Sequence, residues 1–161
     1  IMNLDVIPEE KYSEFIKFHF EHGNRKINED AIHNAYTQFD GVTWYIQKIM
    51  NYAYSITDKG NTFNASRLEE VIEDIVEENS EIYKNLLFLL TSAQKALLIA
   101  IGKEGRVTQI TGRQFIKKYS LPSASSVQKA LAALMDKQMV TNNQGVYEIY
   151  DKFMTIWLSW G

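Results

Sequence analysis

The chain has 161 residues, of which 45% are hydrophobic and 23% are charged, a composition typical of one or two small globular domains. Its lack of cysteine excludes disulfides and thiolate metal sites, and no run approaches the roughly 18 apolar residues of a membrane span. The acidic residues Asp5, Glu9 and Glu10 are unlike a secretory signal. We therefore expect a cytoplasmic location and no membrane partner.

The charge is distributed unevenly along the sequence. Residues 1–90 hold 8 Lys and Arg against 16 Asp and Glu, a net charge of −8, whereas residues 91–161 hold 9 against 4, a net charge of +5. Such a split indicates two units with different partners, and a basic unit is a candidate for binding nucleic acid. Because +5 is modest for a DNA-binding protein, the choice of partner depends on the motifs.

The acidic half has the periodic apolar pattern of four helices, which predicts a small helical bundle. Pro8 and the two glutamates after it predict the start of the first helix, because proline fits the first turn and acids suit the helix dipole. Asn28 is expected to cap the second helix, and Ser66 is expected to form a capping box with Glu69 on the fourth. Residues 55–64, rich in Asp, Lys, Gly and Asn, predict a loop.

The acidic half also contains residue types that are used in metal sites and catalysis. His19 and His22 have the spacing of metal ligands on a helix, but no cysteine or acidic ligand is in register with them. The carboxylates after Ser66 fall on the solvent side of an amphipathic helix. The glycine motifs of phosphate-binding loops, dinucleotide sites and nucleophile elbows are all missing. We therefore expect no metal site and no catalytic residue.

The basic half has the element order of a winged helix-turn-helix. The predicted elements are helices over residues 91–101, 111–119 and 124–139, then a ribbon with its turn at residues 141–145 and its return strand at residues 146–150. Leu121 must be extended, because Pro122 follows it, and this marks the turn between the second and third helices. Thr111 is expected to cap the second helix, and Asp151 an apolar final helix.

In helix-turn-helix proteins the N-terminal part of the third helix enters the major groove of DNA. Ser and Gln can bond to base edges there, while Lys contacts phosphate or guanine. The candidate nucleic-acid-binding residues are Arg113, Lys117, Lys118, Ser123, Ser125, Ser126, Gln128, Lys129, Asn142 and Asn143. In the alternative interpretation the serines only cap a helix, the lysines are solvated, and the domain contacts a protein or its own chain.

Several stretches of the sequence are similar to one family. They are residues 88–105, 125–131 and 147–153, and residues 41–47, which read Gly-Val-Thr-Trp-Tyr-Ile-Gln. These stretches resemble the region after the nucleotide-binding core in archaeal-type P-loop ATPases, of the STAND-like branch of the AAA+ superfamily. The last stretch is similar to the helical lid of that family, where Gly-x-Pro-aromatic-Tyr-x-Gln is usual; this chain has Thr43 in place of the proline.

The resemblance implies a mainly α-helical C-terminal piece of a larger ATPase, with a lid-like helical domain at residues 1–88 and a winged helix-turn-helix at residues 89–161. A start at Ile1 rather than methionine agrees with a piece of a longer protein. ATP and Mg²⁺ would bind in the core of the parent protein, so this chain is expected to hold no cofactor. No catalytic residue of the family has a counterpart here, and the chain by itself is not expected to be an enzyme.

Three hypotheses about function follow. In the first, the chain is a non-catalytic regulatory module whose winged helix binds DNA. In the second, the winged helix docks on the ATPase core or on a partner protein as a nucleotide-dependent switch. The third and weakest is a freestanding transcription regulator. A continuous basic face over Lys117, Lys118, Lys129 and the wing would favour DNA, whereas an exposed apolar patch would favour docking.

Overall fold

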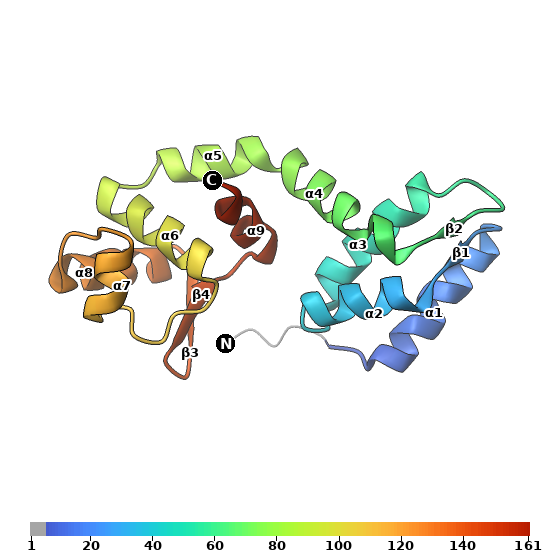
Figure 1. Ribbon diagram of the computed structural model, residues 1–161, viewed down its shortest axis with the longest axis horizontal. Coiled ribbons are helices and arrows are strands. Elements are labelled where there is room, and N and C mark those ends of the chain that lie inside the picture. The colour runs from blue at the N-terminus through green and yellow to red at the C-terminus, as the bar shows by residue number, and fades with distance from the viewer. Residues whose placement is uncertain (1–5) are drawn as a thin grey trace. The chain divides into compact units, whose positions relative to one another are not determined.

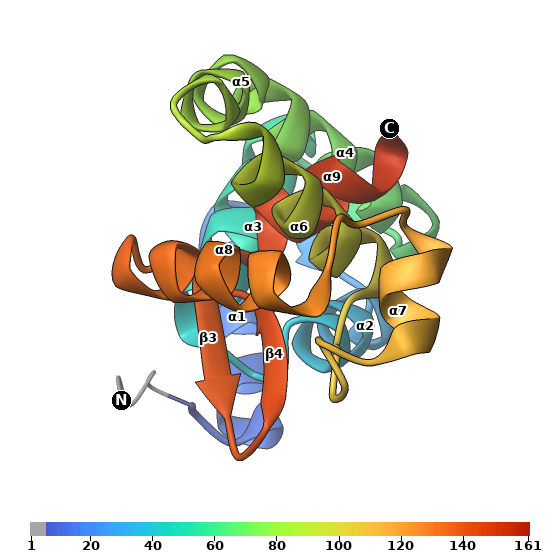
Figure 2. The same cartoon turned by 90° about the vertical axis from the view of Figure 1, so that its left-hand side faces the viewer.

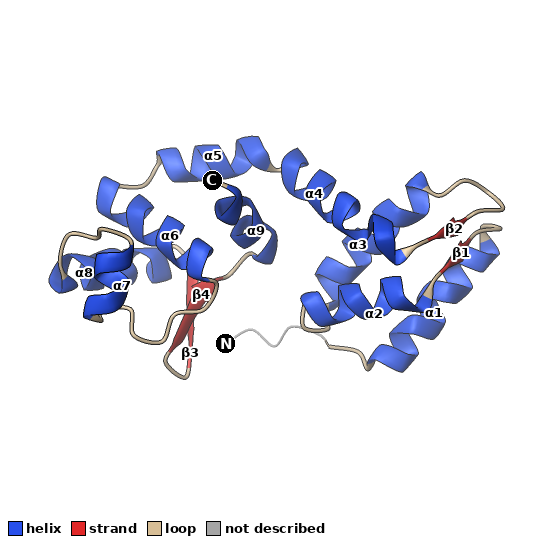
Figure 3. Ribbon diagram, viewed as in Figure 1, coloured by secondary structure: helices blue, strands red, loops and turns tan. Residues whose placement is uncertain are grey.

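The computed structural model describes residues 6–161, and α-helices make up most of this part of the chain (Figure 3). It divides into two compact units, the first ending at Ile75 and the second beginning at Val76 (Figure 1). None of the helices between residues 6 and 161 combines the length and the hydrophobicity needed to cross a membrane. The mainly helical fold class predicted from the sequence is confirmed.

The first unit is built from three helices, a two-stranded pairing and the start of a fourth helix. Its elements are α1 (Glu9–His22), β1 (Lys26–Ile27), α2 (Glu29–Gln38), α3 (Thr43–Ile56), β2 (Thr62–Phe63), the 3-10 turn η1 (Ala65–Arg67) and α4 (Leu68–Glu78). Its largest fully buried side chains are Phe20, Phe39, Phe63, Ile32, Ile46, Ile49 and Ile75. These residues form one apolar core of the kind that a small bundle needs.

Helices α1 and α2 pack together through small apolar residues and polar links. The buried positions of α2 include Ala31 and Ala35, which let the two backbones approach closely. The buried Ser13 hydroxyl of α1 donates a hydrogen bond to Glu29 at the start of α2, at 2.9 Å. The His33 ring lies 2.9 Å from a carboxylate oxygen of Glu9. These contacts fix α2 against the face of α1.

The strands β1 and β2 were not predicted. They pair in parallel, with Ile27 opposite Phe63, inside stretches that carry the turn-forming composition of loops. Each strand is two residues long, too short for the alternating pattern that identifies strands in a sequence. Because Ile27 and Phe63 are both buried, the pairing anchors the long loop after α3 to the core.

Two of the helix caps predicted in the first unit differ in the structure. Asn28 occupies the N-cap position of α2 as expected, but its side-chain amide donates to the Asn64 side chain at 2.9 Å instead of capping the helix. The capping box predicted for Ser66 and Glu69 is wrong, because Ser66 lies inside the turn η1 rather than at an N-cap. The 3-10 turn η1 leads directly into α4, in the place of the predicted capping box.

The second unit has the order predicted for a winged helix-turn-helix, three helices followed by a ribbon, with one further helix at each end. Its elements are α5 (Ser80–Phe88), α6 (Ser92–Glu104), α7 (Arg113–Lys118), α8 (Ala124–Asp136), β3 (Val140–Asn143), β4 (Val146–Ile149) and α9 (Lys152–Trp160). Figure 2 shows α8 crossing in front of α6, with the two strands beside it. The winged-helix architecture is confirmed.

Helix α6 forms the centre of this unit and packs against α8, α9 and β4. Its start is closed by a capping box, in which Thr91 and Gln94 each accept a hydrogen bond from the backbone N–H of the other, at 3.2 and 3.1 Å. Leu98 and Ile101 are completely buried. Gly102 is also buried, because Leu158 of α9 lies directly over it.

Helix α5 belongs to the second unit, although the sequence analysis placed the domain boundary after it, between residues 88 and 89. The Tyr83 ring lies 5.4 Å from the Trp157 ring of α9, measured between centroids. The Trp157 indole N–H donates to the Ser80 hydroxyl at 3.2 Å. The second contact joins residues 77 positions apart, and the first spans almost as many, so local sequence patterns do not reveal them.

Of the caps predicted at Asp151 and Thr111 in the second unit, the first is confirmed and the second is not. Asp151 caps α9 as predicted, since its carboxylate accepts from the backbone N–H groups of Phe153 and Met154. The cap predicted at Thr111 is wrong, because Gly112 takes the N-cap position of α7. The predicted ribbon turn is also shorter than expected, since residues 141–143 belong to β3.

We predict that Gly102→Ala destabilises the second unit. A Cβ at this position would lie 2.7 Å from the Leu158 Cβ. Overpacking of this kind costs about 1–3 kcal/mol, which outweighs the gain of about 1 kcal/mol in helix propensity. Hydrogen exchange of the α6 amides measures the loss. Leu158→Ala keeps the Cβ at 2.7 Å but removes the Cδ1 at 3.0 Å, so in the double variant it should relieve part of the penalty of Gly102→Ala. Strictly additive effects of the two substitutions would contradict the contact.

Candidate nucleic-acid interface

The outer face of α8 is exposed and carries small and polar side chains. Val127, Ala130, Leu131 and Leu134 turn inward and are buried. Ser125, Gln128, Lys129 and Ala132 recur at spacings of three and four residues and are all exposed. The sequence predicted the same two faces. A helix with small residues beside a glutamine and a lysine can approach the floor of a groove in DNA.

The serines at the start of α8 differ in what they do. The Ser123 hydroxyl accepts a hydrogen bond from the backbone N–H of Ser126 at 3.2 Å, so Ser123 is the N-cap. The hydroxyls of Ser123 and Ser125 lie 3.3 Å apart. Ser126 is half-buried. Of the three serines proposed as contacts, Ser125 is therefore the one best placed to reach a ligand.

Three basic residues lie on α7, and one of them has an acidic partner. Arg113 and Lys117 are exposed. The Lys118 ammonium donates to a Glu104 carboxylate oxygen at 2.8 Å, and the Tyr119 hydroxyl donates to the same oxygen. The pair joins the end of α6 to the end of α7. Among the ion pairs of residues 6–161, Lys118 has an acidic partner, whereas Arg113 and Lys117 take part in none.

The contact between α6 and α7 shifts the pKa values of the three side chains that form it. The hydrogen bond from Lys118, then that from Tyr119, lowers the pKa of Glu104 below its ordinary value of 4.5. Each of these two hydrogen bonds also raises the pKa of its donor, Lys118 in one and Tyr119 in the other. All three shifts favour the paired state, with a carboxylate facing an ammonium and a phenol.

The wing is a tight hairpin. Gln144 and Gly145 form its two-residue turn with φ angles of 54° and 86°, the pair of positive angles that a type I′ turn requires. The Asn142 side chain accepts a hydrogen bond from the Gly145 backbone N–H at 2.8 Å, so it stabilises the turn. Asn143 is exposed at the tip.

The loop between α6 and α7 is attached to the wing like a short third strand. Val107 and Tyr147 exchange two backbone hydrogen bonds, at 2.9 and 2.8 Å. Next to Val107, the Arg106 guanidinium lies 3.2 Å from the Glu148 carboxylate of β4. The sequence analysis did not include Arg106 among the candidate residues, because it stands in a loop without a helical pattern.

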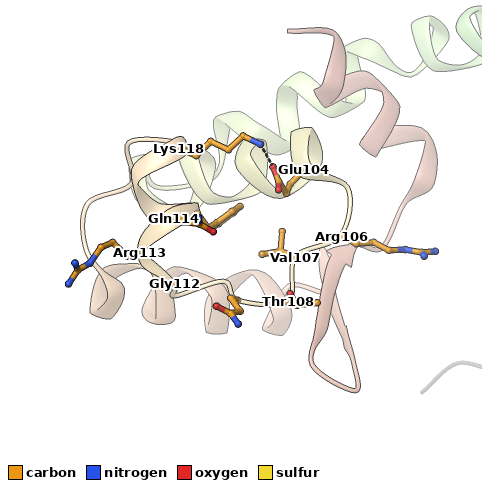
Figure 4. A pocket seen from close by; sticks show the side chains of 10 residues that line it. Glu104, Arg106, Val107, Thr108, Gly112, Arg113, Gln114 and Lys118 are labelled. Carbon is orange, nitrogen blue, oxygen red and sulfur yellow. Dashed lines mark hydrogen bonds and ion pairs between the residues drawn. The ribbon is translucent and has the colours of Figure 1, made fainter.

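A hollow of about 810 Å³ lies beside this loop, between the end of α6 and α7 (Figure 4). Val107 and Phe115 contribute its apolar part, and Gln114 and other polar residues surround them. Figure 4 shows the side chains of Arg106 and Arg113 extending away from the hollow to opposite sides. The cations therefore do not converge on one point inside it, and they are better placed to contact a partner that passes over the surface.

Most of the acids in the basic half are already engaged. Of the four after residue 90, Glu104 pairs with Lys118, Glu148 pairs with Arg106, and Asp151 caps α9. The fourth, Asp136, is exposed at the far end of α8. The start of α8 and the adjoining α7 thus carry exposed positive charge from Arg113, Lys117 and Lys129, with no acidic residue between positions 105 and 135.

The histidines with the spacing of metal ligands lie in the first unit. The His19 ring lies tilted against Tyr54 and the His22 ring stacks on Phe18, so both histidines have aromatic neighbours. Among the residues from 6 to 161, no group of three or more His, Asp or Glu side chains is arranged to hold a metal ion.

Comparison with known proteins identifies the second unit. Residues 81–160 match the model of a family described as a probable winged helix domain. This part of the chain is a winged helix domain. The match includes α5, in agreement with the packing of Tyr83 on Trp157. No curated protein and no solved structure gave a significant match.

We predict that the Glu104 carboxyl titrates below its ordinary pKa of 4.5, because Lys118 and Tyr119 bond to its charged form. A carboxyl with a lowered pKa stabilises the folded state above its ordinary pKa, and this contribution is lost as the pH falls through the lowered value. NMR titration of the side chain measures this pKa directly. Lys118→Ala should raise it and Tyr119→Phe should raise it less, whereas an unchanged value in both variants would contradict the contact.

Proposed function

We propose that the winged helix domain binds duplex DNA, with α8 in the major groove and α7 and the wing on the phosphate backbone. The observation that carries the proposal is the exposed face of α8, where Ser125, Gln128 and Lys129 stand together with no carboxylate on the first two turns. Helix α7, which carries exposed basic side chains, directly precedes α8 in the chain, as the first helix of a helix-turn-helix does.

The residue types on α8 suit reading of base edges. The side-chain amide of Gln128 can donate to and accept from adenine, and the ammonium of Lys129 can donate to guanine or to a phosphate. Ser125 and Ala132 are small, so they leave room for bases or for the thymine methyl group. The Ser123 cap fixes the start of the helix, which gives these side chains a defined position.

Contacts with the DNA backbone fall to the exposed cations. Arg113 and Lys117 have no acidic partner among the ion pairs of the described residues, whereas Lys118 is paired with Glu104. Neutralising phosphates releases counterions, so binding of this type weakens as salt increases. Lys118 would contribute less than the other two, because DNA would have to compete with its carboxylate.

We place this domain in a larger, STAND-like ATPase, in which the chain is a non-catalytic regulatory module. The support for this context is the resemblance of residues 41–47 and 88–105 to that family. ATP and Mg²⁺ would bind in the core of the parent protein. The first unit would act as its lid, and the DNA-binding unit would follow the lid in the chain.

One observation favours the second candidate, in which the winged helix docks on a protein. Four apolar side chains of α5 and the residue after it are exposed: Ile82 by 57%, Leu86 by 39%, Phe88 by 86% and Leu89 by 74%. A patch of this kind marks a surface that another protein covers. Docking through α5 leaves the outer face of α8 open, so it is compatible with DNA binding.

DNA binding is tested by fluorescence anisotropy with random duplex DNA at low and at physiological salt. With random duplex DNA we expect Arg113→Ala and Lys117→Ala each to lower the salt slope by about 1. On a duplex that contains a preferred site, Gln128→Ala and Lys129→Ala should each cost about 1–3 kcal/mol. Lys118→Ala should have the smallest effect among the basic substitutions, because the Lys118 ammonium is already paired with Glu104.

The matched control is Lys95→Ala/Lys103→Ala, which removes two exposed positive charges from α6, outside α7, α8 and the wing. It should weaken binding less than Arg113→Ala/Lys117→Ala, although the net charges are equal. No binding of the unmodified chain at low salt would contradict the proposal and favour docking. Equal losses in both double variants would show attraction by net charge alone.

A further inference from the structure

We propose that the chain self-associates: a groove between α1 and α3 of one copy binds the exposed stripe of α5 from a second copy. The two surfaces belong to different units of the chain, and their charges are opposite in sign. One combines exposed aromatic rings with positive charge, and the other combines exposed aliphatic side chains with negative charge. The inference goes beyond the proposed binding of DNA and does not depend on it.

The groove consists of two adjoining hollows on the surface of the first unit. One, of about 280 Å³, is lined by Ile7, Lys11, Tyr12, Phe15, Thr43 and Gln47. The other, of about 90 Å³, shares Tyr12, Phe15 and Gln47 with it and extends along both helices to His19, Met50 and Asn51. Because they share three lining residues, the two hollows adjoin each other along α1 and α3, and a helix laid across them would place side chains in both.

Large aromatic side chains lie exposed on the helices that form this groove. On α1, Phe15 is 64% exposed and Phe18 is 69% exposed, and on α3, Trp44 is 58% exposed. Aromatic residues of this size contribute most when they are buried against a partner, which is why they are enriched in interfaces. Three of them on two neighbouring helices indicate a binding surface rather than scattered apolar residues.

The groove is positive within an acidic unit. Residues 1–75 hold 7 Lys and Arg against 13 Asp and Glu, a net charge of −6. Yet the one Lys or Arg among the residues lining the groove is Lys11, beside the titratable His19 and Tyr12, and no carboxylate is among them. Lys48 adds a further cation above the Trp44 ring, 5.3 Å from its centroid. A partner with carboxylates would therefore be attracted here.

The stripe on α5 has the complementary composition. Ile82, Leu86 and Leu89 follow each other at spacings of four and three residues, so they share one side of the helix and its end. All three are exposed, and Phe88 beside them is more exposed still. The buried side of the helix is occupied by Tyr83 and Leu87, so the stripe is not part of the core of its own unit.

Acidic residues lie at the beginning of this stripe. Glu81 is exposed on the first turn of α5, and the exposed Glu77 and Glu78 end α4 just before it. The Lys84 ammonium, the one cation on α5, is 3.6 Å from Glu81, a surface ion pair that contributes little and is easily exchanged. A second copy would present aliphatic side chains to the groove and these carboxylates to Lys11 and Lys48.

The opposite charges of the two surfaces, each beside exposed apolar side chains, point to a second copy as the occupant. The contact is heterologous, because the groove and the stripe are different surfaces. Two copies that exchange both contacts form a closed dimer, whereas copies that exchange only one form a chain. A nucleic-acid strand on the same aromatic groove would be repelled by the acidic unit around it, so protein is the better fit.

The experiment uses sedimentation equilibrium of the unmodified chain and of two charge-reversal variants. We expect the chain to associate as its concentration rises. Lys11→Glu/Lys48→Glu makes the groove acidic, and Glu78→Lys/Glu81→Lys makes the stripe basic. Each variant alone should dissociate at least about tenfold more readily, because like charges then face each other. An equimolar mixture of the two should associate again, since each surface then meets the opposite charge.

A matched control reverses two exposed lysines elsewhere in the first unit, Lys26→Glu/Lys59→Glu, and should associate like the unmodified chain. All substituted residues are exposed, and circular dichroism verifies that the helices form in each variant. A chain that stays monomeric at every concentration would overturn the proposal. So would association that neither variant weakens, or a mixture that stays dissociated.

Discussion

Burial of α6 is the constraint on which the winged helix domain depends. Leu98 and Ile101 lose all exposure to water only because α8, α9 and β4 enclose the helix from three directions. At about 25 cal/mol per Å² of apolar surface, this enclosure is the main favourable term for the domain. Gly102 sets how closely α9 can approach. The inner face of α8 is used in this core, and its outer face is thereby turned to solvent.

Polar contacts determine how the other elements stand around α6. The capping box of Thr91 and Gln94 fixes where the helix begins, and the Glu104–Lys118 pair ties its end to α7. Val107 links the intervening loop to the wing. The Glu104–Lys118 pair is exposed and individually weak, whereas Val107 is buried, and together these contacts hold α7 and the wing beside α6.

Strong local patterns in the sequence were sufficient to predict most helices and the winged-helix order. The inward positions of α8 repeat every three or four residues, and Pro122 marks the turn before it, so both were predictable. The pairing of Ile27 with Phe63 and the packing of Tyr83 on Trp157 join distant residues, and short-range patterns contain no sign of them. The pairing of Lys118 with Glu104, 14 positions earlier, was not predictable for the same reason, although Lys118 had been selected by its residue type.

The distant contacts between α6 and α9 also bear on how the chain folds as it is synthesised. Leu158 covers Gly102, 56 positions earlier in the chain, so the core of the second unit lacks one wall until α9 has been made. The core of the first unit is complete by Ile75. Since domains generally fold as units during translation, the first unit can form while α6 still exposes the apolar side that α9 will cover. The ribosome-bound chain therefore passes through a stage in which α6 is a target for chaperones.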